Sequence, residues 1–121
     1  MARGLIFNVG ARSSALHAGT SIIDVEGEVD VLTSPRFRTA LAEAVDMGAS
    51  SIIINLDKVQ YMDSTGLGVL VSAMKRVREK DGVIVLTGLN SHLGKIFEIT
   101  GLRKVFNVYA TESEALDACL K

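Results

Sequence analysis

The chain has 121 residues, of which 48% are hydrophobic and 22% charged, and its formal net charge is -1. This length and balance predict one globular domain covering residues 1–121 and exclude a disordered chain. The nearly balanced charge, without a run of like-charged residues, disfavours direct nucleic-acid binding. No apolar stretch is long enough for a signal peptide or a membrane span, so the sequence predicts a cytoplasmic protein without a membrane partner.

Two short, β-branched segments stand near the start of the chain. Residues 5–9 and 21–25 are predicted to form antiparallel strands joined by a loose turn, with Gly27 ending the second strand. The apolar residues that follow recur at three- and four-residue steps. This period predicts an amphipathic helix, with Pro35 close to its start and Gly48 just past its end.

The rest of the chain alternates between strand and helix patterns. Residues 51–56 form an apolar run, which predicts a central strand covered on both faces. The later elements are predicted as helix, strand, helix, strand and helix at residues 67–77, 83–86, 93–102, 105–109 and 112–120.

The predicted order is therefore ββαβαβαβα, an α/β fold with about four helices. Strands and helices that alternate at this length need crossover connections, which lay the helices on a mostly parallel sheet. The first strand then adds one antiparallel edge. A fold of this class does not by itself determine a function.

The segment between the third strand and the second helix carries the chemical information. Asp63, Ser64 and Thr65 are residue types that cap a helix by accepting hydrogen bonds from its free N–H groups. Gly66 and Gly68 leave the backbone of the first turns approachable. A hydroxyl at this place lies at the positive end of the helix dipole, which tolerates an added phosphate. From residue types alone, a simple N-cap at Asp63 or Ser64 is the favoured interpretation over a phosphorylation site.

Residues 59–70, Val-Gln-Tyr-Met-Asp-Ser-Thr-Gly-Leu-Gly-Val-Leu, resemble the signature of bacterial STAS domains in the anti-sigma-factor-antagonist branch. Two further segments resemble the same family: residues 27–30 (Gly-Glu-Val-Asp) ahead of Pro35, and residues 99–102 (Ile-Thr-Gly-Leu) before the last strand. The resemblance implies a STAS-like fold and makes Ser64 the phosphorylated residue.

What the resemblance implies is a switch between partners. The unphosphorylated protein would bind an anti-sigma factor that is also a serine/threonine kinase, and so release a sigma factor. Phosphorylation of Ser64 would end that binding until a serine phosphatase removes the phosphate, and the chain itself would need no cofactor. Thr65 stands where many members have a second serine, and it keeps a hydroxyl. Asp30 is expected at the same end of the sheet as Ser64, where a site role and ordinary helix capping both stay open.

Other functions stay open beside this one. Some STAS domains are stressosome scaffolds or subunits of lipid-transport machines. A hydrolase with Ser64 as nucleophile would need His17 or His92 and an acid such as Asp63, but surface or capping roles are favoured for both histidines. A nucleotide or small-molecule sensor would use the turn at Gly66 as an anion site.

Overall fold

The structure is a computed structural model, and it describes residues 7–13 and 19–119. Its centre is a five-stranded sheet in which the strands lie side by side in the order of the sequence. The strands are β1 (Phe7–Ser13), β2 (Thr20–Val29), β3 (Ser51–Met62), β4 (Val83–Thr87) and β5 (Asn107–Tyr109). β1 pairs antiparallel with β2, and each later pair of neighbours is parallel. The predicted mostly parallel sheet with one antiparallel edge strand is confirmed.

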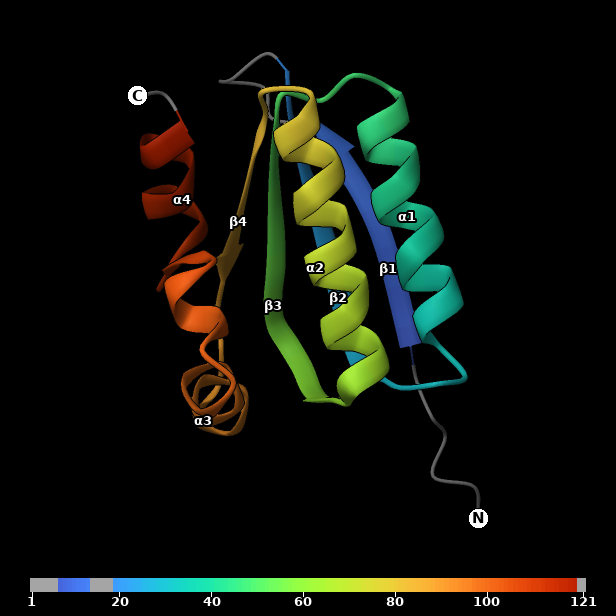
Figure 1. Ribbon diagram of the computed structural model, residues 1–121, viewed down its shortest axis with the longest axis vertical. Helices are drawn as coiled ribbons and strands as arrows, with labels where there is room; N and C mark the ends of the chain where they lie inside the picture. Colours follow the sequence, from blue (N-terminus) through green and yellow to red (C-terminus); the bar gives the residue numbers. More distant parts are fainter. Residues whose placement is uncertain (1–6, 14–18, 120–121) are drawn as a thin grey trace.

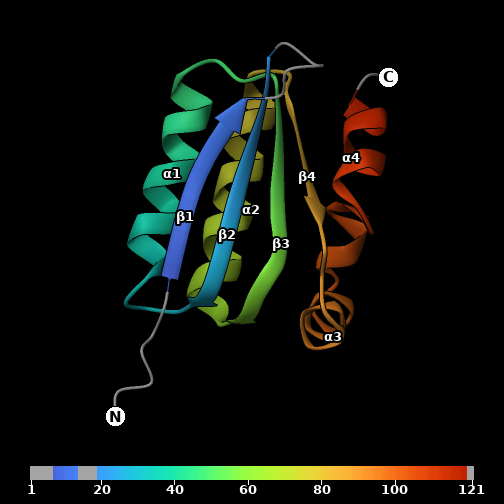
Figure 2. The same cartoon turned by 180° about the vertical axis from the view of Figure 1, so that it is seen from behind.

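The helices of the described residues are α1 (Ser34–Asp46), α2 (Ser64–Glu79), α3 (Ser91–Ile99) and α4 (Glu112–Cys119), with the short 3-10 helix η1 (Leu102–Lys104) before β5. α1 and α2 lie side by side on one face of the sheet (Figure 1). The buried side chains of α3, Leu93 and Phe97, belong to the same core as those of α1 and α2, whereas α4 packs on the other face, against β3, β4 and β5. Figure 2 shows no helix of the described elements over the second face of β1, whereas Ile22 of β2 belongs to one core cluster with Ala115 of α4. The predicted order ββαβαβαβα is confirmed.

Alternation along the strands divides the apolar side chains between two cores. Ile23 and Ile54 belong to the main core under α1 and α2, whereas their neighbours Ile22 and Ile53 belong to a smaller core under α4. Successive strand residues face opposite sides of a sheet, which explains this division. All four side chains are at most 1% exposed. Burial on both faces is the reason why β3 begins as an apolar run.

The expectation that Gly27 ends the second strand is wrong. Gly27 has a positive φ of 104° and lies beside a register shift between β2 and β3. At such a bulge the strand bends without ending, and glycine accepts the unusual backbone conformation. β2 therefore continues to Val29, which pairs with Met62 at the end of β3.

Two other boundaries differ from the sequence-based ranges for physical reasons. β3 extends past Leu56 to Met62, because the polar residues after Leu56 still pair with β2. The third helix ends at Ile99 and not at Leu102. Gly101 has a left-handed φ of 78°, which breaks the helix, and the chain continues as η1.

The ends of the first and last strands differ from the predicted ranges. β1 continues to Ser13, four residues past its predicted end, and β5 begins at Asn107, two residues later than predicted. Residues 5 and 6 of the first predicted strand lie outside the described residues. Residues 14–18, which include His17, and Leu120 lie outside the described residues. Over residues 7–13 and 19–119, every helix is too short or too polar to cross a membrane.

Candidate functional site

Two turns meet at the end of the sheet where β2 and β3 finish. β2 and β3 are parallel neighbours, and their register pairs Val29 with Met62. The backbone amide of Asp63 then donates a hydrogen bond to the carbonyl of Val29 at 3.0 Å. The turn that begins at Asp30 therefore lies beside the start of α2 at Ser64 (Figure 1). This confirms that Asp30 and Ser64 share one end of the sheet.

Asp63 is the N-cap residue of α2. One of its carboxylate oxygens accepts hydrogen bonds from the amides of Thr65 at 2.9 Å and Gly66 at 3.3 Å, and also from the Thr65 hydroxyl. These bonds satisfy amide groups that the start of a helix leaves without partners. The pKa of Asp63 lies below its ordinary value. The hydrogen bond from the Thr65 hydroxyl lowers it most, and the amides of Gly66, Thr65 and Val31 add smaller effects in the same direction. Asp63, and not Ser64, therefore caps the helix.

Ser64 is the first residue of α2, and its side chain is exposed. Within the described residues no hydrogen bond holds its hydroxyl, whereas the half-buried Thr65 donates its hydroxyl to Asp63. The two adjacent hydroxyls are therefore different chemically. The hydroxyl of Ser64 is open to another molecule and lies at the positive end of the α2 dipole.

Asp30 organises the neighbouring turn. Its carboxylate accepts hydrogen bonds from the amides of Leu32 at 2.9 Å and Thr33 at 3.1 Å. The amide of Asp30 donates in return to the Thr33 hydroxyl, which donates to the carbonyl of Glu28 at 2.8 Å. These bonds hold the turn in one shape ahead of α1, so the local role of Asp30 is positional.

The same turn exposes two apolar side chains that sequence reasoning missed. Val31 is 67% exposed and Leu32 is 74% exposed. The hydrogen bonds of Asp30 fix the backbone of this turn, in which both side chains face solvent. The sequence does hold a signal for this exposed apolar pair. The two residues stand between an acidic residue and the proline at the start of a helix, where a turn is expected. They give the end of the molecule near Ser64 an apolar surface.

The two glycines of the motif have different surroundings. A Cβ atom on Gly66 would lie 2.5 Å from Cγ of Met62 and 2.7 Å from Cγ1 of Val29, so α2 can pack this closely on the sheet only with glycine there. A Cβ atom on Gly68 would meet nothing within 4 Å. Gly68 is exposed and lies four residues after Ser64, so the two share one face of α2.

A family model described as STAS domain matches residues 13–115. The chain belongs to the STAS domain family. This confirms the resemblance seen in the sequence, and it places the two turns described above within a fold that the family shares.

Two relatives of this STAS domain are named anti-sigma-B factor antagonist. The relative from Staphylococcus aureus is 38% identical over 86 residues, which cover 71% of this chain and 80% of the relative. The relative from Listeria monocytogenes is 41% identical over 92 residues, which cover 76% and 81%.

Solved structures confirm the STAS-like fold. An anti-sigma factor antagonist from Mycobacterium paratuberculosis has a TM-score of 0.87 at 24% identity, over 100% of both chains. The anti-sigma factor antagonist SpoIIAA in its unphosphorylated form has a TM-score of 0.75 at 27% identity, over 93% of this chain and 95% of SpoIIAA. The phosphorylated form of the Bacillus protein SpoIIAA has a TM-score of 0.69, also at 27% identity, over 93% and 98%.

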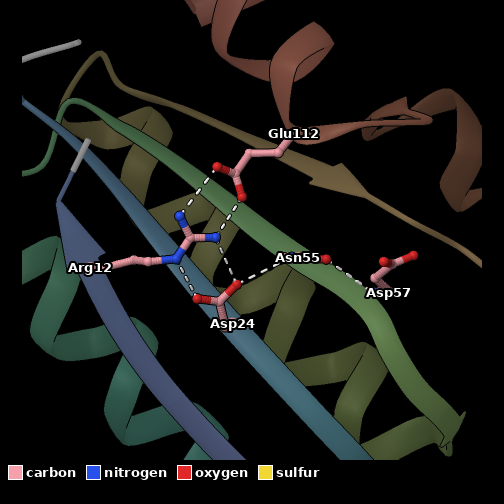
Figure 3. A network of polar contacts seen from close by, with 5 residues as sticks. All are labelled: Arg12, Asp24, Asn55, Asp57 and Glu112. Carbon is pink, nitrogen blue, oxygen red and sulfur yellow. Dashed lines mark hydrogen bonds and ion pairs between the residues drawn. The ribbon is translucent and has the colours of Figure 1, made fainter. Parts of the chain in front are cut away.

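A second polar cluster lies away from the Ser64 end of this STAS domain, on the sheet face on which α4 packs. Arg12 of β1 donates hydrogen bonds to both Asp24 and Glu112, and Asn55 donates to Asp24 at 3.1 Å (Figure 3). Arg12, more than the other neighbours, lowers the pKa of Asp24. Motifs and spacing do not reveal this cluster, because its members are far apart along the chain.

Within residues 7–13 and 19–119, the groups that a hydrolase or a metal enzyme would need are not assembled. His92 stacks on Tyr61, with ring centroids 6.1 Å apart, and among the described residues no histidine hydrogen bonds to Ser64. Nor do three or more His, Cys, Asp or Glu residues come together there as metal ligands would.

Proposed function

We propose that this STAS domain is an anti-sigma-factor antagonist that acts by binding, with Ser64 as its switch. In the unphosphorylated form it binds an anti-sigma factor that is also a serine/threonine kinase, which releases a sigma factor. Phosphorylation of Ser64 by that kinase ends the binding, and a serine phosphatase restores it. The observation that carries the proposal is an exposed serine hydroxyl at a helix start, which no hydrogen bond from the described residues holds, beside the exposed Val31 and Leu32.

The names of the relatives support the choice of partner. Two are anti-sigma-B factor antagonists at 38% and 41% identity. SpoIIAA, at 27% identity, has a phosphorylated form. The inference to this chain is that its partner is an anti-sigma factor and that its own control is covalent.

Local geometry favours Ser64 over Thr65 as the acceptor of the phosphoryl group. The Ser64 oxygen is exposed and can approach the γ-phosphorus of ATP held by the kinase. A new O–P bond forms, ADP leaves, and the hydroxyl proton passes to a base of the kinase. Thr65 would first have to break its hydrogen bond to Asp63, which also caps α2.

The phosphate acts on the partner and leaves the fold intact. It adds a charge of about -1.5 to -2 at neutral pH, and the α2 dipole stabilises that charge within this chain. A partner that covers Val31 and Leu32 would have to remove water from the same charge, at a cost of several kcal/mol. Binding is therefore lost while folding is kept.

The remaining residues of the predicted site support this surface in different ways. Asp30 shapes the turn that presents Val31 and Leu32, and Asp63 caps the helix that presents Ser64. Gly66 lets α2 sit close to the sheet, and Gly68 keeps the helix surface beyond Ser64 low enough for a partner backbone to approach.

The switch is tested by calorimetry with the cognate anti-sigma factor kinase and by intact-mass analysis after ATP is added. Ser64→Asp should fold normally but bind roughly a hundredfold more weakly, since each 1.4 kcal/mol is about a tenfold change. Ser64→Ala should keep the binding and take up no phosphate. The matched control is Ser113→Asp, an exposed serine in the first turn of α4, which should change neither.

A second pair of variants tests the apolar surface. Leu32→Ser should weaken kinase binding with little change in stability, whereas Met47→Ser, 87% exposed at the other end of α1, should leave kinase binding unchanged. Wild-type affinity in both Ser64→Asp and Leu32→Ser would overturn the proposed site. Phosphate uptake in Ser64→Ala at the wild-type rate would assign the modification to another hydroxyl.

The rival roles predict different results in the same assays. A scaffold subunit would bind its partners regardless of charge at Ser64. A sensor would bind a nucleotide in competition with the kinase, and a hydrolase would show ester turnover that Ser64→Ala abolishes.

A further inference from the structure

Among the described strands, β1 lies at one edge of the sheet. It pairs with β2 over residues 7–13, and no strand of the described residues pairs with its other side. Most of its residues are exposed, and it is seven residues long, against three for β5 at the opposite edge. Such an edge presents unpaired N–H and C=O groups that can pair with another chain.

Residues 7–13 themselves show little of the usual protection of an edge strand. Proteins commonly protect edges with prolines or with charged side chains that face solvent. β1 has no proline, and its one charged residue is Arg12. The Arg12 guanidinium lies over the sheet face, where it is paired with Asp24 and Glu112 (Figure 3). The single charge of the strand is therefore already neutralised within the chain.

α1 runs beside this edge and carries opposite charges toward its two ends. Near its start, Arg36 donates a hydrogen bond to the carbonyl of Phe7 at 3.3 Å and lies over the Phe7 ring. Seven residues later on the same side, Glu43 lines a groove of about 690 Å³ between α1 and β1. Ala40 lines the same groove at a position between Arg36 and Glu43. Because its side chain is small, the middle of the α1 surface along this edge protrudes little.

We propose that β1 pairs antiparallel with β1 of a second copy of this chain, about a two-fold axis at Gly10. The two sheets then become one continuous sheet. A two-fold interface uses the same surface of both copies, so that surface must be complementary to itself. Gly10 is the middle residue of β1.

The register leaves no like charges opposite each other in the strands. Gly10 faces its own copy, Val9 faces Ala11 of the second copy, and Asn8 faces Arg12 of the second copy. Like charges placed directly opposite would destabilise such a pair. The only charged side chain of the strand therefore faces an amide.

The helices become complementary under the same axis. α1 has 13 residues and β1 has seven, and at about 1.5 Å and 3.3 Å per residue both are about 20 Å long. They begin at the same end, since Arg36 contacts Phe7. Their middles, at Ala40 and Gly10, are then level, and the two-fold axis brings Arg36 of each copy opposite Glu43 of the other.

The dimer is compatible with the proposed switch and independent of it. Ser64 lies at the end of the sheet where β2 and β3 finish. A two-fold axis across β1 sends the two Ser64 residues to opposite ends of the joined sheet. Each copy can then bind its own partner.

Sedimentation velocity of the full chain over a concentration series tests the proposal. The wild type should form a species of twice the chain mass of 12.9 kDa. Arg36→Glu and Glu43→Arg should each weaken dimerisation about tenfold, because each places two like-charge pairs across the axis. An equimolar mixture of the two variants should regain the affinity, because both pairs are then of opposite charge. Glu79→Arg, an exposed charge reversal on α2, is the control and should have no effect.

Restoration in the mixture separates the interface from a folding defect in either variant. Gly10→Cys combined with Cys119→Ser should also form an intermolecular disulfide on oxidation, which tests the register. A wild type that stays monomeric at every concentration would overturn the proposal, as would a dimer that neither charge reversal weakens.

Discussion

Alanine at Gly66 should destabilise this STAS domain, whereas alanine at Gly68 should stabilise it. Both glycines lie in α2, two residues apart, and in the sequence they look alike. The structure separates them by what a methyl group would meet. At Gly66 the new Cβ would lie 2.5 Å from Met62 and 2.7 Å from Val29, and at Gly68 it would lie in open space.

The size of each effect follows from these surroundings. Carbon atoms pack at about 3.5–4.0 Å, so Met62 and Val29 would each have to move by about 1 Å. Met62 is 1% exposed and Val29 is fully buried, so neither can turn into solvent. Such overpacking costs about 1–3 kcal/mol, which the gain of up to about 1 kcal/mol in helix propensity only partly offsets. We expect a net loss of about 1–2 kcal/mol for Gly66→Ala and a gain of up to about 1 kcal/mol for Gly68→Ala.

Urea unfolding of the two variants beside the wild type measures the difference. The midpoints should move in opposite directions with similar slopes, because neither variant changes the surface exposed on unfolding. Gly68→Ala should in addition bind the anti-sigma factor kinase more weakly although it is more stable. A Gly66→Ala protein as stable as the wild type would refute the close packing of α2 on the sheet, and a destabilised Gly68→Ala would give Gly68 a role within the fold.

Two further predictions concern the core and the carboxylates. Ile53→Asp should abolish the cooperative thermal transition, because it buries an unpaired charge at a fully buried site. The total stability of such a fold is only about 5–15 kcal/mol. A soluble, cooperatively melting variant would contradict the assignment of β3. The pKa values of Asp24 and Asp63 are lowered in the folded state, so both ionised carboxylates add to the free energy of unfolding. This contribution is complete when the pH is above the pKa of an unfolded aspartate, about 3.9, and it is lost as the pH falls through the lower pKa values of the folded state. Urea midpoints at neutral and acid pH should show this loss, and Asp63→Asn should reduce it; an equal acid loss in the variant would exclude Asp63 as a source.

The sequence alone was enough to predict the order of elements, the mixed sheet and the placement of Asp30 beside Ser64. Apolar residues recur with the period of a strand or a helix, and that period depends only on local backbone geometry. Parallel strands end at the same edge of a sheet, so residues that follow two of them meet. The helix cap at the start of α2 was predictable for the same local reason, although the sequence left open whether Asp63 or Ser64 supplied it.

Tertiary structure alone decided the features that depend on register and depth. Gly27 bends β2 without ending it because of its pairing with β3, and no local pattern distinguishes a bulge from a turn. Whether Ser64 or Thr65 has a free hydroxyl depends on one hydrogen bond to Asp63. Gly66 and Gly68 share a residue type but differ in what lies above them. Composition and period describe a residue's own backbone, whereas these features depend on atoms brought close by distant parts of the chain.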